Sequence, residues 1–90
     1  MFVGTQRSVE SEGIDRRDAY INNYYDMFIN SVCKNNKNAV LVMQVGSAVM
    51  PSGWDRKVKG LVHMWLAGEA GGSSVADVLT GRVNPSGKLS

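Results

Sequence analysis

One apolar run, AVLVMQV at residues 39–45, limits most strongly what this chain can fold into. A strand with one wet face alternates apolar and polar residues, whereas every residue of this run except Gln44 is apolar. Strands that are buried on both faces show this composition, and they belong to parallel sheets covered by helices on two sides. The run therefore predicts a central strand of a parallel sheet.

Two further apolar segments are expected to pair with this strand. LVHMWL at residues 61–66 is a second buried run, and it follows a stretch punctuated by Gly46, Pro51 and Gly53. Met1 to Val3 are apolar and lead directly into Gly4, as the last residues of a buried strand do. This start makes the N-terminus look truncated.

Two segments have helical periodicity. The first starts at Asp18 as a candidate N-cap and has apolar residues at helical spacing, namely Ile21, Tyr24, Tyr25, Phe28, Ile29 and Val32. The second follows the glycine-rich stretch AGEAGGSS, with Ser73 or Ser74 as its cap and its end at Gly81. Both are predicted to be amphipathic helices.

The alternation of strands and helices predicts the α/β class, as a partial three-layer α/β sandwich with a mostly parallel sheet. A chain of 90 residues with two helices cannot cover both faces of such a sheet, and open sheet edges invite association. We therefore expect an architecture that is incomplete as it stands, within a larger domain.

Charge and composition exclude several functional classes. Ten Lys and Arg against eight Asp and Glu, spread along the chain, form no basic stripe for nucleic acid. The single cysteine, Cys33, allows no internal disulfide and has no companions at metal-ligand spacing. No apolar run approaches the roughly 20 residues of a membrane span, and no export signal is visible. We expect no membrane association and a cytoplasmic location, and the oligomeric state stays open.

The most charged segment is SVESEGIDRR at residues 8–17, which contains three acids: Glu10, Glu12 and Asp15. From the residues alone, it is a solvated loop, because a carboxylate in a polar loop is usually a surface charge. A catalytic role for one of these acids needs further support.

Several stretches together resemble glycoside hydrolase family 3, the β-glucosidase-like enzymes. They are SEGIDR (residues 11–16), AVLVMQVGSAV (39–49), Trp54, MWLAGEAGG (64–72) and VADVLTGRVNPSGKL (75–89). The resemblance covers essentially the whole chain, and its closing segment is the most specific part.

This resemblance implies a two-domain retaining glycosidase that acts on terminal β-linked sugars. A barrel-like first domain would carry an aspartate nucleophile, and an α/β sandwich second domain would supply the general acid/base. Residues 1–90 would be part of the second domain, and the barrel would be absent. The implied partners are a carbohydrate substrate and the missing barrel domain, and no cofactor or metal is implied.

The same resemblance assigns Glu12 as the general acid/base. Gly13 would let the loop turn beside the carboxylate, and Asp15 and Arg16 would hold the loop. Glu10 is a weaker candidate. Other branches of the family place the acid/base in the later glycine-rich loop, but here that position is Ala70, and Glu69 lies one residue early.

Two other interpretations remain open. A strand followed by a glycine-rich turn and a helix could cradle phosphate, which would make the chain a small nucleotide-binding module, although Glu69 would repel a phosphate. The isolated chain could also be catalytically inert. Trp54 is either a sugar-stacking or a core residue, and packing roles are expected for the remaining conspicuous side chains: Tyr20, Tyr24, Tyr25, Cys33, His63 and Trp65.

Overall fold

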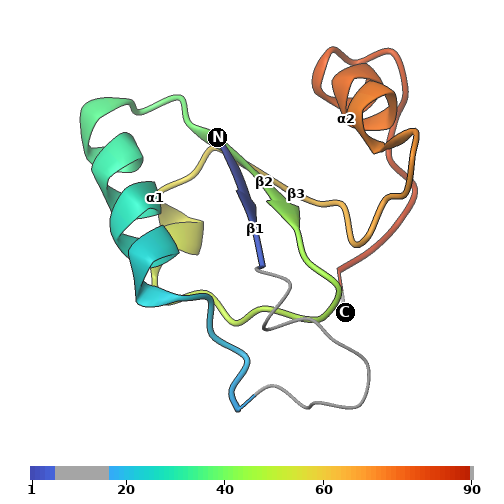
Figure 1. Ribbon diagram of the computed structural model, residues 1–90. Helices are drawn as coiled ribbons and strands as arrows, with labels where there is room; N and C mark the ends of the chain where they lie inside the picture. Colours follow the sequence, from blue (N-terminus) through green and yellow to red (C-terminus); the bar gives the residue numbers. More distant parts are fainter. Residues whose placement is uncertain (6–16, 90) are drawn as a thin grey trace.

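The structure, a computed structural model, describes residues 1–5 and 17–89. Three parallel strands form one sheet in the order β1-β2-β3: β1 (Phe2–Gly4), β2 (Val40–Gln44) and β3 (Gly60–His63). The helices are α1 (Asn23–Asn35), the short 3₁₀ helix η1 (Trp54–Arg56) and α2 (Gly71–Leu79). Figure 1 shows α1 and α2 on opposite sides of the sheet. The α/β class and the partial three-layer arrangement are therefore confirmed.

Strand β2 is central, as predicted. Val42 pairs with Phe2 of β1 on one side and with Val62 of β3 on the other. Leu41, Val42 and Met43 are all buried, so both faces of this strand are covered. The apolar run at residues 39–45 thus packs on both faces of the sheet.

Helix α1 begins four residues later than the sequence suggested. Its N-cap is Asn22, whose side-chain oxygen accepts a hydrogen bond from the Tyr24 amide at 2.9 Å. Asp18 instead accepts from the Tyr20 amide, and Tyr20 forms a parallel bridge with Met50. Because this pairing holds Tyr20 in an extended conformation, the predicted cap at Asp18 was wrong.

The main core lies between the sheet and α1. It consists of buried residues from β1, α1, β2, η1 and the residues next to α1 and β2, namely Val3, Ile21, Ile29, Leu41, Met43, Val45 and Trp54. The Trp54 indole N–H donates to Oδ1 of Asp26 in the first turn of α1 at 2.9 Å, and the Ser52 hydroxyl donates to Oδ2 of Asp26. Trp54 is therefore a core residue that is also hydrogen-bonded to α1.

The tyrosines behave differently from the prediction. Tyr25 packs against the core, but Tyr20 and Tyr24 are exposed. The shift in the start of α1 explains the error at Tyr20, since this residue lies outside the helix. Cys33 is partly buried against the core, where it was expected.

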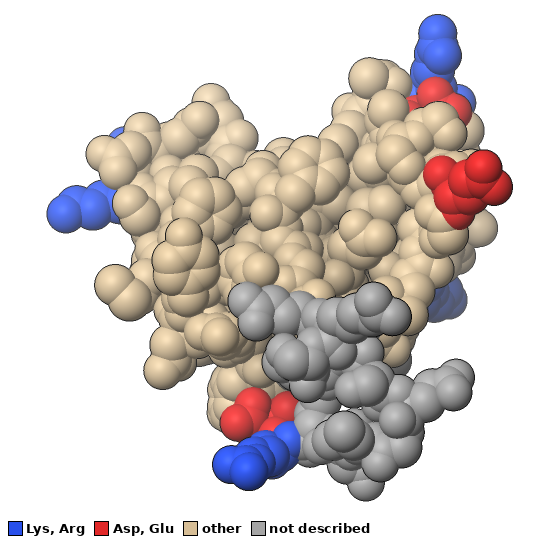
Figure 2. All heavy atoms as spheres, viewed as in Figure 1, with Lys and Arg blue, Asp and Glu red and all other residues tan. Residues whose placement is uncertain are grey.

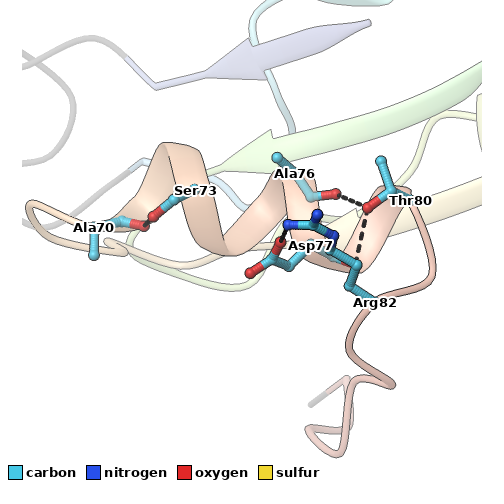
Figure 3. A network of polar contacts seen from close by, with 6 residues as sticks. All are labelled: Ala70, Ser73, Ala76, Asp77, Thr80 and Arg82. Atoms are coloured by element: carbon cyan, nitrogen blue, oxygen red, sulfur yellow. Dashed lines mark hydrogen bonds and ion pairs between the residues drawn. The ribbon is translucent and has the colours of Figure 1, made fainter.

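Helix α2 is capped by its backbone at both ends. Ser73 or Ser74 was expected as the cap, but the Ser73 hydroxyl donates to the carbonyl of the N-cap residue, Ala70 (Figure 3). The Ser74 hydroxyl donates to the same carbonyl. The end at Gly81 is as predicted: the Gly81 amide donates to Val78 and the Arg82 amide donates to Asp77. This bond pair is a Schellman motif, and the φ of 78° at Gly81 is the left-handed conformation it needs.

Charged side chains are unevenly distributed over the visible surface. In Figure 2, charged side chains lie only at the margins of the visible face, and uncharged residues cover its middle. None of the helices in the described residues is long and apolar enough to span a membrane.

Candidate functional site

The carboxyl ends of the three strands define one edge of the sheet, which we call the carboxyl edge. The strands are parallel, so the segments that follow Gly4, Gln44 and His63 all leave from this edge. In open α/β sheets, ligands bind outside the carboxyl ends of the strands. This edge is the first place to look for a site.

The segment that follows β1 is the one that carries the predicted acids. Glu10, Glu12, Gly13, Asp15 and Arg16 lie outside the described residues, so their predicted roles stay predictions. Both flanks of the segment are described, and they are Thr5 and Arg17.

The two flanks are held at the carboxyl edge. Thr5 directly follows the last residue of β1. On the other side, the Met50 amide donates to the Ala19 carbonyl at 2.8 Å, next to the Tyr20–Met50 bridge. Met50 follows β2 by six residues, so Ala19 is hydrogen-bonded to the segment that leaves β2 from the carboxyl edge.

The segment after β3 turns sharply. Trp65 has a φ of 57° and Gly68 a φ of 69°. A positive φ is unusual for a bulky residue, and strained positions of this kind gather at functional sites. The turn ends β3 at His63, so the predicted strand at residues 61–66 is correct only in its first half.

A glycine fixes this turn against α2. A Cβ at Gly71 would lie only 2.9 Å from the Cβ of Ala67, closer than side chains tolerate. Gly71 therefore permits the turn to fold back on the first residues of α2. Glu69 is exposed in this turn, and Ala70 offers only a methyl group and a backbone carbonyl that already accepts from Ser73 and Ser74.

An apolar hollow of about 360 Å³ lies beside β3. It is lined by residues of β3, of the following turn, of α2 and of the C-terminal segment, namely Leu61, Val62, His63, Met64, Trp65, Ala67, Ser74, Val75, Val78, Pro85, Gly87, Lys88 and Leu89. Sequence reasoning did not find this hollow, because it depends on how the C-terminal segment returns toward β3.

His63 and Trp65 form a close, tilted ring pair on the wall of the hollow. Their ring centroids are 4.2 Å apart and their planes are inclined by 55°. Both ring nitrogens of His63 are buried and have no hydrogen-bond partner among the described residues. A buried histidine was expected to be hydrogen-bonded, and that part of the prediction was wrong. Trp65 was expected in the core, but it is partly exposed.

The described residues contain little that could bind a metal or a phosphate. Within residues 1–5 and 17–89, no three His, Cys, Asp or Glu side chains gather as a metal site would need. The serines at the start of α2 donate to Ala70, and Glu69 lies beside them. This arrangement does not favour the phosphate-binding interpretation.

Comparison with known proteins identifies a family whose model matches this chain. The model for "Glycosyl hydrolase family 3 C-terminal domain" matches residues 1–90. An exo-alpha-(1->6)-L-arabinopyranosidase of Bifidobacterium longum is 39% identical over 89 residues, and a probable beta-glucosidase I of Aspergillus oryzae is 44% identical over 90. Each match covers 99% of this chain, but only 12% and 10% of those two relatives.

A solved structure is similar throughout. A GH3 beta-glucosidase of Bifidobacterium adolescentis matches with a TM-score of 0.92 and 43% identity. The match covers 99% of this chain and 13% of that protein. The chain therefore spans about an eighth, or less, of the proteins it resembles.

Proposed function

The chain belongs to glycosyl hydrolase family 3, as part of the C-terminal domain, and from this premise we propose that it supplies the general acid/base of a retaining glycosidase. Glycosidase activity is the common ground of the relatives, which are named as beta-glucosidases and as an arabinopyranosidase. The finer proposal concerns one residue, Glu12, and one edge of the sheet.

One observation carries the proposal. The segment that contains Glu12 has both flanks at the carboxyl edge, where Thr5 follows β1 and Ala19 is hydrogen-bonded to Met50. Because α/β sheets bind ligands at this edge, we propose that the Glu12 carboxylate acts there. The pattern Glu12, Gly13, Ile14, Asp15, Arg16 supports the assignment, because it is similar to the acid/base loop of many family members.

The chemistry requires a second carboxylate. A retaining glycosidase holds two carboxyl groups about 5–5.5 Å apart, one as nucleophile and one as acid/base. Glu12 would protonate the leaving oxygen in the first step, and its carboxylate would then accept a proton from the attacking water in the second. We propose that the nucleophile lies in an N-terminal barrel domain outside these 90 residues, and that the isolated chain is inactive.

The described residues argue against the alternative position for the acid/base, which is occupied by Ala70. In the turn after β3, Ala70 has no group that can donate a proton, and its carbonyl is occupied by two serine hydroxyls. Glu69 is exposed one position earlier. This leaves Glu12 as the stronger candidate for the proton donor.

The proposed substrate class is a terminal β-linked sugar. The beta-glucosidases among the relatives support this class, and another relative is named as an exo-alpha-(1->6)-L-arabinopyranosidase. These names differ although the matching segments are similar, so we assign the choice of sugar to parts of the parent protein outside this segment.

The test uses a chimera, in which this chain replaces the matching segment of the Bifidobacterium adolescentis enzyme. Glu12→Ala should lower kcat/KM by about 10²–10⁴-fold for substrates with poor leaving groups, because these need protonation. Activated aryl glycosides should lose much less in the first step. Glu10→Ala is the matched control and should change neither class.

A result would contradict the assignment if Glu12→Ala lowered both substrate classes equally. The same holds if Glu10→Ala reproduced the leaving-group dependence. Either outcome would remove the acid/base role from Glu12.

A further inference from the structure

Helix α1 is hydrogen-bonded to the connection between β2 and β3 at two places. In the first turn of the helix, Oδ1 of Asp26 accepts the Trp54 indole N–H at 2.9 Å and Oδ2 accepts the Ser52 hydroxyl. One turn later, the Lys57 ammonium donates to the side-chain oxygen of Asn30 at 2.6 Å. We call these the Asp26 contact and the Asn30 contact. Both hold the same connection against the same helix, so their effects can be compared directly.

The two contacts lie toward opposite ends of the strands. Figure 1 shows the first turn of α1 at the end of the molecule where β1 and β2 finish, which is the carboxyl edge. Lys57 instead adjoins the start of β3, where the Lys59 amide donates to the Ala39 carbonyl just before β2 at 2.8 Å. The Asp26 contact is therefore the one that lies near the candidate site.

The Asp26 contact completes a closed ring of interactions. Ser52 follows Met50 by two residues, and the proline between them has a fixed φ, so this link is short and stiff. The Met50 amide donates to the Ala19 carbonyl at 2.8 Å, and from Ala19 the chain runs into α1 and back to Asp26. All of these interactions lie within residues 17–89. The stretch that leads into α1 and the stretch after β2 are thus joined at both of their ends.

A carboxylate suits its place in this ring for a chemical reason. An ionised carboxylate has two acceptor oxygens and no donor, and each oxygen of Asp26 receives one of the two hydrogen bonds. The negative charge also lies in the first turn of α1, where the helix dipole favours it. Trp54 is 1% exposed, so its indole N–H has little access to water. Loss of the Asp26 carboxylate would leave a buried donor unpaired and would open the ring.

We infer that Asp26 is a positioning residue for the proposed reaction, because it fixes Ala19 and Tyr20 through their pairing with Met50. The inference rests on the proposed function, since Ala19 and Tyr20 belong to the described flank of the segment that carries the proposed acid/base. Asp26 itself contacts no reacting group. It acts through the backbone, and a misplacement of about 1 Å at a reacting group can lower a rate by about 10²-fold.

The test compares the two contacts in the same chimera. Asp26→Ala should lower kcat/KM by about 10–10²-fold for substrates with poor leaving groups, because a misplaced proton donor matters most where protonation is needed. Activated aryl glycosides should lose much less in the first step. Asp26→Asn keeps the shape of the side chain and one acceptor oxygen, so it should retain most of the activity. Asn30→Ala is the matched control, which removes the Asn30 contact and should change neither class.

Two further measurements separate positioning from folding. Ser52→Ala removes one of the two hydrogen bonds at an exposed side chain, so the fold should persist and a smaller loss should show the same leaving-group dependence. Hydrogen exchange of the chimera can be followed by mass spectrometry. In Asp26→Ala, the peptide with the Met50 amide should exchange faster, whereas the peptide with the Lys59 amide should be unchanged.

Three outcomes would change the interpretation. If Glu12→Ala shows the leaving-group dependence but Asp26→Ala matches Asn30→Ala, the acid/base proposal stands and Asp26 only stabilises the core. If Asp26→Ala shows the dependence and Glu12→Ala does not, Asp26 still positions the proton donor, and the assignment of that donor to Glu12 fails. If neither variant shows it, both proposals are wrong.

Discussion

The two faces of the sheet are packed to different degrees. On the α1 side, Ile29, Leu41 and Trp54 are completely buried, and Asp26 links the helix to the segment after β2 through two hydrogen bonds. On the α2 side, Val75 is the buried large side chain of the helix, and a hollow of about 360 Å³ lies beside β3. The α1 side is a closed core, whereas the α2 side is packed less completely.

This difference separates the elements that the core fixes from those that leave apolar groups uncovered. The closed side gives β1, β2 and α1 a fixed arrangement, and these elements hold the flanks of the Glu12 segment. The open side contributes β3, α2 and the strained turn at Trp65, which leave apolar groups uncovered. The comparison predicts that substitutions on the closed side cost more stability than matched substitutions on the open side.

The largest effect is expected from the two tryptophans. Trp54→Ala should lower the free energy of unfolding by about 3–5 kcal/mol, because it opens a cavity in a closed core. Trp54 is 1% exposed and Trp65 is 41% exposed, so Trp65→Ala should cost clearly less. Equilibrium urea unfolding of the 90-residue chain measures both. Equal losses would show that the two sides are equally closed.

A smaller effect is expected at the start of α2. Gly71→Ala places a methyl group against Ala67 and should cost about 1–3 kcal/mol, as overpacking does. The neighbouring Gly72 has nothing within 4 Å of an added Cβ, so Gly72→Ala should stabilise the helix by about 0.5–1 kcal/mol. Thermal melts of the pair give opposite shifts in this account. Shifts of the same sign would mean that the turn does not rest on α2.

A stabilising effect, of the same sign as that of Gly72→Ala, is expected at His63. His63→Leu removes two buried ring nitrogens for which residues 1–5 and 17–89 supply no hydrogen-bond partner. Removing an unsatisfied polar group relieves its desolvation cost, so the 90-residue chain should become more stable, by about 1 kcal/mol. Urea unfolding tests this, with Leu61→Val as a control for altered packing. A marked loss of stability would show that the imidazole has a partner in solution.

Sequence patterns predicted the elements better than their ends. The run at residues 39–45 was sufficient for the central strand, because burial on two faces leaves a direct mark on composition. The start of α1 was misplaced because Asp18 is a good cap by type, and the pairing of Tyr20 with Met50 is a contact between distant residues. The turn at Trp65 was missed because a positive φ is usually signalled by a glycine in the sequence, and here the residue is a tryptophan.

The candidate site was predicted through the family resemblance. From the residues alone, Glu12 is one acid among three in a polar segment, and nothing in its spacing selects it. The sequence could not predict the hollow or the tilted ring pair of His63 and Trp65. Both depend on how β3, α2 and the C-terminal residues pack together.

The most direct test of the central claim, that this segment supplies the acid/base, is rescue of the chimera by azide. In Glu12→Ala, the glycosyl-enzyme intermediate should persist because water lacks its general base, whereas azide is already an anion and needs none. The account predicts that azide restores turnover of an activated aryl β-glycoside and yields the β-glycosyl azide. Turnover of Glu12→Ala that is undiminished without azide and insensitive to it would contradict the account.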